Sequence, residues 1–356
     1  MLRYLNMRNL KKFSKKTCLL RIDLNIEPGA SLDSYRLQAI LPTIKLLLKN
    51  KVKVVILSHR GRPKGFDKKY SLKPFIQVFH KELGGKVNFL PDFDFPKIKN
   101  RIEESKPRSV FLLENLRFLP GEEKNDPGFA MQLSLLGDFY VNDAFAVSHR
   151  KNASVCAITK FLPSYAGLCL ENEIKNLGTI INYSTHPFIV ILGGAKLKEK
   201  ILNLRGLINK ADNVLLGSNA FNESGVPKSS KFVWPEDAKS SAGRRNRKSI
   251  WDIGPFTVGN YASVISGAKT IIWSGPPGFF EKKGFEKGTI GIWKAVLKSA
   301  SRRKKTHIVI GGGETSASLK LLGKVRIPRN IFISTGGGAM LEYLSSKKLP
   351  GIESLK

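Results

Sequence analysis

Residues 51–63 read KVKVVILSHRGRP, and this stretch decides the fold class. The apolar run VVIL is typical of a strand that is buried on both faces, and the polar SHRGRP after it is typical of a loop. The same pattern of an apolar run ending in polar or glycine-rich residues recurs at residues 17–24, 109–118, 138–145, 188–196, 213–217, 269–278, 307–314 and 330–338. Stretches with helical spacing of apolar residues, such as 35–50, lie between most of these runs. The alternation predicts an α/β fold, with parallel strands covered by helices on both faces.

The polar residues fall where each predicted strand ends. In open parallel sheets, ligands bind at the carboxyl ends of the strands. The strand ends of the first half of the chain carry arginine and histidine, whereas those of the second half carry glycine clusters and lysine. The sequence therefore predicts two binding edges of different chemistry.

Length and composition set the class of protein. A chain of 356 residues predicts two domains, and 42% apolar with 25% charged residues is ordinary for a folded protein and excludes a disordered, collagenous or coiled-coil chain. Three scattered cysteines predict no disulfide framework and fit a reducing compartment, so we expect the cytoplasm. No apolar stretch is long enough to predict a membrane span, and the basic start lacks the apolar core of a secretory signal. The predicted strand at 17–24 leaves little room for a transit peptide.

The formal charge of +32 predicts an anionic partner. The excess of lysine and arginine is spread over both halves of the chain, so it is not a basic tail on a neutral domain. Phosphorylated metabolites, nucleotides, nucleic acid and an anionic membrane surface all remain open on charge alone. The sequence shows no nucleic-acid motif and no aromatics interleaved with the charge, which disfavours nucleic acid.

A basic set in the first half is the first candidate site: Arg36, His59, Arg62, Arg117, His149 and Arg150. Guanidinium groups grip phosphate and carboxylate oxygens bidentately, so several at one sheet edge would bind a small, multiply charged anion. The alternative is that each arginine is only solvated surface charge. Their shared position after predicted strands favours the binding site.

The second half carries glycine-rich turns that predict a nucleotide site. In GGAKLKEK (193–200), Lys196 and Lys200 lie four residues apart and share one helix face. The turns GGGETS (311–316), STGGGAM (334–340) and SGPPG (274–278) each follow a predicted strand, and exposed amides at such turns can cradle phosphates. Glu281 and Glu314 lie in these turns as candidates for a ribose hydroxyl or Mg²⁺. The alternatives are surface lysines, glycines needed for packing, and acids that only cap helices.

Taken together and in order, these segments resemble the phosphoglycerate kinase family. The blocks that carry the resemblance are RIDLN (21–25), LPTIKLLL (41–48), SHRGRPKG (58–65), LLENLRF (112–118), YVNDAFAVSHR (140–150), FLPSYAGLCLENE (161–173), ILGGAKLKEK (191–200), DIGPFT (252–257), WSGPPGFFE (273–281), GGGETS (311–316) and STGGGAMLEYL…KLPG (334–351). One such block is weak evidence, but eleven in the family's order are specific.

The resemblance implies two Rossmann-like domains of parallel sheet joined by a hinge helix. The implied boundaries are a phosphoglycerate-binding domain at 1–170, the hinge helix at 171–182, a nucleotide-binding domain at 183–340 and a segment at 341–356 that returns to the first domain. It also implies a monomer that binds 3-phosphoglycerate and Mg²⁺ with ATP or ADP, and no membrane.

The resemblance also assigns roles by matching position. The residues implied to hold the phosphoglycerate are Asp23, Asn25, Arg36, His59, Arg62, Arg117, His149 and Arg150. Lys196 is implied to meet the transferring phosphoryl group. The residues implied to meet the nucleotide are Lys200, Glu281, Gly311, Gly312, Gly313, Glu314 and Thr315, with Glu314 next to the metal.

The implied reaction suits these residues. A carboxylate nucleophile is ionised at neutral pH, so the reaction needs no general base. The transition state spreads negative charge over the phosphoryl oxygens, which Arg36, Lys196 and the amides of Gly312 and Gly313 would stabilise. We therefore expect reversible phosphoryl transfer between ATP and the carboxylate of 3-phosphoglycerate.

Four departures from the family's pattern fall on the nucleotide side. Residues 218–234, which begin SNAFNESG, replace a longer segment, and Ser274, Glu314 and Ile250 replace the residues the family usually carries. They leave open a relative that binds phosphoglycerate but has lost productive nucleotide binding. A nucleic-acid-binding protein is the remaining, more distant alternative.

Overall fold

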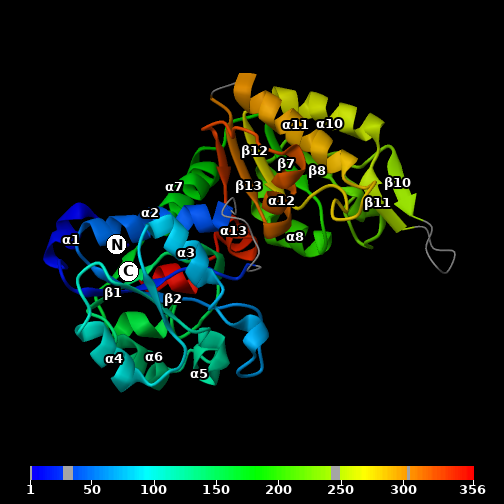
Figure 1. Cartoon of the computed structure of the whole chain (residues 1–356). Coiled ribbons are helices and arrows are strands. Elements are labelled where there is room, and N and C mark those ends of the chain that lie inside the picture. Colours follow the sequence, from blue (N-terminus) through cyan, green and yellow to red (C-terminus); the bar gives the residue numbers. More distant parts are fainter. Residues whose placement is uncertain (1, 27–34, 242–248, 303–304) are drawn as a thin grey trace. The chain divides into compact units, whose positions relative to one another are not determined.

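The computed structural model describes residues 2–26, 35–241, 249–302 and 305–356 (Figure 1). The chain forms two compact units, which we call unit 1 (Met1–Ile174 with Lys348–Lys356) and unit 2 (Lys175–Lys347). The division falls inside helix α7 (Leu168–Tyr183). The last residues join unit 1, where the Gly351 amide donates to the Ser148 carbonyl at 2.8 Å and the Asn142 side chain donates to the Gly351 carbonyl at 3.1 Å.

Unit 1 is built on a parallel sheet of strand order β3-β4-β2-β1-β5-β6. Four strands coincide with predicted apolar runs: β1 (Thr17–Arg21), β2 (Lys53–Leu57), β4 (Val110–Leu113) and β5 (Phe139–Asn142). The sequence analysis missed β3 (Val87–Leu90) and β6 (Ser164–Ala166). Both are short strands at the sheet edges, where the pairing partner rather than a long apolar run defines the strand.

The helices of unit 1 lie along the chain between and around these strands. They are α1 (Met7–Lys12), α2 (Tyr35–Lys49), α3 (Phe75–Leu83), α4 (Phe95–Glu103), α5 (Pro120–Glu123), α6 (Pro127–Ser134), the first part of α7, and α14 (Pro350–Glu353). In α2, Leu37, Ile40, Ile44 and Leu47 are buried at helical spacing and join the core beside strand residues such as Val54. Short 3₁₀ turns follow several strands: η1 (Lys68–Tyr70), η2 (Leu116–Phe118), η3 (Phe145–Val147) and η4 (Ala157–Lys160).

Unit 2 repeats this architecture, with a parallel sheet of order β14-β13-β12-β7-β8-β9. Its strands are β7 (Phe188–Leu192), β8 (Asn213–Leu216), β9 (Phe232–Val233), β12 (Thr270–Ser274), β13 (His307–Gly311) and β14 (Ile331–Ile333). Its helices are α8 (Leu197–Asn203), α9 (Arg205–Lys210), α10 (Pro255–Gly267), α11 (Lys287–Arg302), α12 (Gly313–Ala317) and α13 (Gly338–Leu344), with 3₁₀ turns η5 (Ser218–Phe221) and η6 (Ser318–Leu322). Helices α10 and α11 pack side by side along the sheet (Figure 1). The two parallel sheets confirm the predicted α/β fold.

One local expectation was wrong in part. The polar, basic and turn-rich sequence KSSAGRRNRK (239–248) predicts an exposed loop, but Lys239–Ser241 belong to β10 (Ala238–Ser241), which pairs antiparallel with β11 (Ser249–Ile253). The partner SIWDI is rich in β-forming residues, and it draws the polar segment into a hairpin. The remainder of the expected loop, 242–248, lies outside the described residues. Among the helices that the structure describes, none is long and apolar enough to cross a membrane.

Candidate functional site

The basic candidates of unit 1 gather around His59, which follows β2. The ring of His59 is only 2% exposed. Burial, and then the positive charges of Arg21, Arg117, Arg150 and Arg36, hold the pKa of His59 well below its usual range. The positive charges of four arginines therefore act on one imidazole at the carboxyl edge of the sheet, and the imidazole is neutral.

Asp23 and Asn25, which follow β1, fix the position of Arg36 at the start of α2. Arg36 Nη1 lies 3.3 Å from Asp23 Oδ2 and donates to the Asn25 carbonyl at 3.4 Å. The side-chain oxygen of Asn25 accepts from the Gly61 amide at 2.9 Å and so ties the β1 loop to the β2 loop. A carboxylate and a carbonyl thus orient this guanidinium.

Arg117 is held by the loop after β2, the same loop that Asn25 contacts. It is buried in η2, where Nη1 donates to the Gly61 carbonyl and Nε lies 3.1 Å from Glu123 Oε1. Burial, together with the charges of Arg150 and Arg21, lowers the pKa of Arg117 to about 10 despite the nearby Glu123. The guanidinium remains protonated at neutral pH.

The other candidates of unit 1 are more accessible. Arg62 is exposed next to Gly61, and Arg150 Nε donates to His149 Nε2 at 3.3 Å after η3. His149 and Arg150 are half-buried. The structure thus places buried, fixed cations beside more accessible ones at the same strand ends.

Arg21 is the member of this cluster that sequence reasoning missed. It ends β1, is buried, and donates from Nη2 to His59 Nδ1 at 3.1 Å and from Nε to Ser154 Oγ at 2.9 Å. The buried carboxylate of Glu122 accepts from Ser154 Oγ at 2.7 Å and lies 3.9 Å from Arg21 Nη2. An arginine at the end of the apolar run TCLLR was the available signal, because a buried charge requires a partner.

This contact fixes the tautomer of His59. A guanidinium can only donate hydrogen bonds, so Nδ1 of His59 accepts and the neutral ring carries its proton on Nε2. His59 thereby keeps one N–H donor that the Arg21 contact does not use.

Asp143, which follows β5, is a second buried group near this edge. Its Oδ1 accepts from the amides of Cys169 and Leu170 at 2.8 and 3.1 Å and so caps the start of α7. Burial raises the pKa of Asp143 to about 7, and hydrogen bonds to the carboxylate only partly oppose this. Gly167 leaves no room for a Cβ beside the carboxylate.

The candidate site of unit 2 is made of interlocked backbone loops. The Gly193 amide donates to the Ser274 carbonyl at 3.1 Å, and the Gly194 amide donates to the Pro276 carbonyl at 2.8 Å. Gly275 has φ +91°, and a Cβ there would collide with the Gly193 carbonyl. These glycines are required because two backbones approach each other directly.

Thr315 ties the Gly311–Gly313 turn to the same loops. Its buried hydroxyl accepts from the Gly275 amide at 2.8 Å. Gly312 has φ +101° and begins α12 as its N-cap. The GGAK, SGPPG and GGGET turns therefore form one structure at the carboxyl ends of β7, β12 and β13.

Two lysines with different surroundings flank these loops. Lys200 Nζ donates to the Gly193 carbonyl at 2.6 Å; burial lowers its pKa, which the nearby Glu314 and Glu223 partly restore. Lys196 is exposed, adopts φ +60°, and its Nζ lies 3.2 Å from Glu199. Glu314 is exposed, and a Cβ on Gly194 would lie 3.0 Å from its Oε2.

Glu281 stands apart from these groups. It is exposed after β12, and within the described part of the chain it makes no hydrogen bond or ion pair with the other candidates of unit 2.

Of the departures from the family's pattern, Ser274 is buried at the end of β12, and the Ile250 amide donates to the Asn222 side chain at 3.1 Å. Behind the loops, Asp252 accepts from the Gly288 amide at 2.9 Å, and burial raises the pKa of Asp252 to about 6.

The described residues hold no group of three or more His, Cys, Asp or Glu that could bind a metal by itself. A Mg²⁺ ion bound with a nucleotide needs only one or two carboxylates, because phosphates and waters complete its shell. The accessible carboxylate of Glu314, beside Lys200 and the glycine loops, fits that kind of ion.

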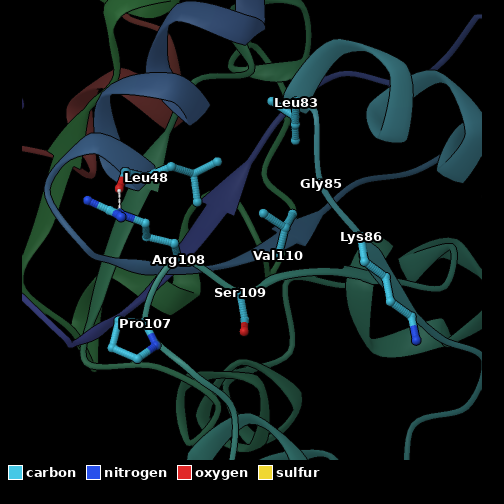
Figure 2. Close-up of a pocket in the computed structure, with 8 residues that line it drawn as sticks. All are labelled: Leu48, Leu83, Gly85, Lys86, Pro107, Arg108, Ser109 and Val110. Carbon is cyan, nitrogen blue, oxygen red and sulfur yellow. Dashed lines mark hydrogen bonds between the residues drawn. The ribbon is translucent and has the colours of Figure 1, made fainter.

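A hollow of about 340 Å³ lies elsewhere on unit 1 (Figure 2). It is lined by Leu48, Leu83, Gly85, Lys86, Pro107, Arg108, Ser109 and Val110. Val110 is the first residue of β4, so the hollow lies at the amino edge of the sheet, opposite to the arginine cluster. Its charged groups are Lys86 and Arg108, whose Nε donates to the Leu48 carbonyl at 3.1 Å. The hollow is thus separate from the candidate site.

Comparisons with known proteins agree with this arrangement. The sequence model of the family described as phosphoglycerate kinase matches residues 7–224 and 226–347. The chain is 37% identical to phosphoglycerate kinase from Wolbachia pipientis wMel, covering 96% of both chains, and 39% identical to that from Orientia tsutsugamushi (strain Ikeda), covering 96% and 94%. The crystal structure of phosphoglycerate kinase from Pyrococcus horikoshii OT3 matches with a TM-score of 0.84 at 28% identity, covering 100% of this chain and 98% of that one. The structure of the enzyme from Coxiella burnetii gives 0.75 at 30% identity, covering 99% and 98%.

Proposed function

The chain belongs to the phosphoglycerate kinase family, and from this we infer its reaction, the reversible phosphoryl transfer between ATP and the carboxylate of 3-phosphoglycerate that gives ADP and 1,3-bisphosphoglycerate. It is a phosphotransferase with a carboxyl group as acceptor and belongs to glycolysis and gluconeogenesis. The observation that carries this conclusion is the family match over nearly the whole chain.

Unit 1 binds the phosphoglycerate in this proposal. The support is the cluster of cations around His59, because a substrate with a phosphate and a carboxylate needs several donors from different directions. Arg62 is exposed and can move onto the ligand, whereas Arg36, Arg117 and His59 are held in advance by hydrogen bonds. His59 offers its Nε2 proton to the substrate.

Unit 2 binds the nucleotide in this proposal. Helix α7, in which the chain passes from unit 1 to unit 2, is the hinge. The amides of Gly312 and Gly313 and the ammonium of Lys200 meet the phosphates, and the exposed Lys196 meets the transferring phosphoryl group. The attacking carboxylate is already ionised, so the residues of the chain orient the reactants and neutralise charge but need not move a proton. Glu281 is kept in the nucleotide set as the weakest member, because its place in the structure adds no support.

Magnesium accompanies the nucleotide in this proposal. Glu314 is the residue that would hold it together with the phosphates. When bound, the ion neutralises charge on the phosphate oxygens.

We also propose a monomer that works in the cytoplasm. The three cysteines, Cys18, Cys156 and Cys169, are all free thiols, as a reducing compartment allows. Gel filtration with light scattering measures the oligomeric state directly.

A coupled assay tests the proposed function. Purified protein is mixed with 3-phosphoglycerate, Mg²⁺ and ATP, or GTP in parallel, and 1,3-bisphosphoglycerate is followed by NADH oxidation through added glyceraldehyde-3-phosphate dehydrogenase. We expect turnover with ATP. A folded protein that binds 3-phosphoglycerate in calorimetry but turns over with neither nucleotide would overturn the proposal and favour a phosphoglycerate-binding relative.

A further inference from the structure

The helix that carries Lys196 and Lys200 has no cap of its own. Lys196 is the N-cap of α8, its φ and ψ are +60° and +43°, and its side chain makes no capping hydrogen bond. A lysine cannot cap, because its ammonium group has no acceptor for the first amides of the helix. A left-handed conformation is also unfavourable for a residue with a side chain. Something else must hold this turn.

Glu223 supplies the missing cap from another part of the chain. Its Oε1 accepts from the Leu197 amide at 3.0 Å, and its Oε2 accepts from the Lys198 amide at 3.0 Å. These are the first two amides of α8, and both carboxylate oxygens are used. Hydrogen bonds of amides to an ionised carboxylate are stronger than neutral ones, and the negative charge also suits the start of a helix.

Asn219 fixes Glu223 and ties it to the GGAK turn. The Asn219 side chain donates to Glu223 Oε1 and to the Gly194 carbonyl, the latter at 3.2 Å. The Glu223 amide in turn donates to the Asn219 carbonyl at 3.1 Å. The two side chains thus connect the loop before Lys196 with the helix after it.

Glu223 also contributes charge. Lys200 Nζ is largely buried against the Gly193 carbonyl, and two carboxylates face it, Glu314 from α12 and Glu223 from the segment after η5. Removing either carboxylate leaves the ammonium with less compensation for burial.

Both Asn219 and Glu223 lie in the segment that departs from the family's pattern, where SNAFNESG begins at 218. In the structure this segment forms only the 3₁₀ turn η5 before Glu223. Its contacts give the shortened segment a specific task next to the site.

We propose that Glu223 is a positioning residue for phosphoryl transfer, and that its carboxylate caps α8 and so holds Lys196 and Lys200 in their working orientation. The inference rests on the proposed function, because it takes these lysines as the groups that meet the phosphates. Glu223 itself touches neither reactant in this proposal.

Steady-state kinetics of E223A and E223Q test the proposal. We expect E223A to lower kcat at least tenfold while the KM for 3-phosphoglycerate stays within twofold. E223Q keeps one carbonyl acceptor for an α8 amide and should recover part of the lost kcat. A purely structural role would not produce this order of kcat values.

Two matched variants serve as controls. D126A removes the cap that Asp126 gives α6 in unit 1, where Oδ1 accepts from the Phe129 amide at 2.6 Å, and it shows what the loss of a cap does to stability alone. E236Q removes one exposed carboxylate of unit 2, which accepts from the Asn260 side chain. Both controls should retain the wild-type kcat.

Calorimetry with Mg²⁺ and ADP separates this inference from the proposed function. If the wild type shows no turnover, the proposed function fails, and a loss of ADP affinity of fivefold or more in E223A still supports the role of Glu223. Unchanged kcat in E223A with only a lower melting temperature, or tighter ADP binding in both variants at unchanged kcat, would overturn the inference. The first result would mean that Glu223 only caps α8 for stability. The second would mean that its negative charge only repels the phosphates of the nucleotide.

Discussion

The two units hold their candidate groups in opposite ways. In unit 1 the central groups are buried side chains that hold one another, as Arg21 holds His59 and Glu122 balances Arg21. In unit 2 the frame is backbone, with glycine turns in direct contact and an exposed Lys196 whose side chain is 72% accessible. One site therefore depends on the identity of its side chains, and the other depends on the absence of side chains at its glycines.

This difference bears on the four departures that the sequence analysis expects on the nucleotide side. Changing a member of a buried charged network leaves another charge without its partner, which is costly. A backbone frame is less sensitive to neighbouring side chains, because amides and carbonyls remain when Ser274 or Glu314 replaces the usual residue. Departures on the nucleotide side are thus tolerated structurally, provided that the glycines stay.

The largest effect expected from this comparison is on stability in unit 1. R21M leaves the buried Glu122 without its cation, so we expect the free energy of unfolding to fall by about 3–5 kcal/mol. K16M is the matched control, because Lys16 pairs with Asp138 at 3.5 Å on the surface and its loss should cost less than about 1 kcal/mol. Urea unfolding followed by circular dichroism measures both.

A double variant sharpens this test. R21M/E122Q removes both charges and should recover much of the stability, but the His59 tautomer is no longer fixed, so the KM for 3-phosphoglycerate should remain raised. Equal costs for R21M and K16M would contradict the view that unit 1 depends on this network.

The next effect is on turnover and compares one cation from each unit. R36A and K196A should each lower kcat/KM by about 10²–10³, because each removes a charge that faces the developing phosphoryl charge. R36A should raise the KM for 3-phosphoglycerate, whereas K196A should lower kcat and leave that KM unchanged. K210A, at the exposed end of α9, is the control. Wild-type turnover in both R36A and K196A would refute the assigned roles.

Much of this arrangement was predictable because parallel sheets bring strand ends to one edge. Long apolar runs located β1, β2, β4, β5 and the interior strands of unit 2, and the residues after them gave the arginine cluster and the glycine turns. The short edge strands β3, β6 and β9 were missed, because partners rather than runs define them. The residues that lie at the carboxyl ends of the long strands could therefore be predicted from the sequence.

What holds the site groups in place could not be read in this way. Arg21 and Ser154 are 133 positions apart, and Glu223 lies 26 positions after Leu197, so no local pattern connects them. Burial was equally hidden, since Arg62 and Arg117 look alike in the sequence but only Arg117 is buried. Long-range partners require the fold before they can be recognised.

A glycine variant tests the backbone frame of unit 2. G275A should lower the free energy of unfolding by about 2–3 kcal/mol and abolish most turnover, because the new Cβ would collide with the Gly193 carbonyl at φ +91°. G84A in unit 1 is the control: it has φ +63° at the end of α3 but nothing within 4 Å, so about 1 kcal/mol is expected. All four tryptophans (234, 251, 273 and 293) lie in unit 2, so fluorescence reports its unfolding. A G275A protein as stable as G84A would mean that the loops are not in direct contact.

The smallest effect compares the buried carboxylates of the two units through pH. Burial raises the pKa of Asp143 in unit 1 to about 7 and that of Asp252 in unit 2 to about 6, both above the value of an unfolded chain. A raised pKa means that the folded state binds the proton more tightly, so the stabilising contribution is complete below about pH 4 and is lost as pH rises through the folded pKa.

As pH rises, D143N and D252N should therefore become more stable relative to the wild type. Each variant should do so over its own range of pH. Asn keeps an oxygen for the amides of Cys169 and Leu170 and cannot ionise, so the gap to D143N should widen between about pH 4 and 7. For D252N the gap should be smaller and should stop widening near pH 6, because burial raises the pKa of Asp252 less than that of Asp143. Hydrogen exchange of α7 amides follows the first change and tryptophan fluorescence the second. A gap that stays constant from pH 4 to 8 would show that the carboxylate ionises as it does in water, and that burial in that unit does not control its charge.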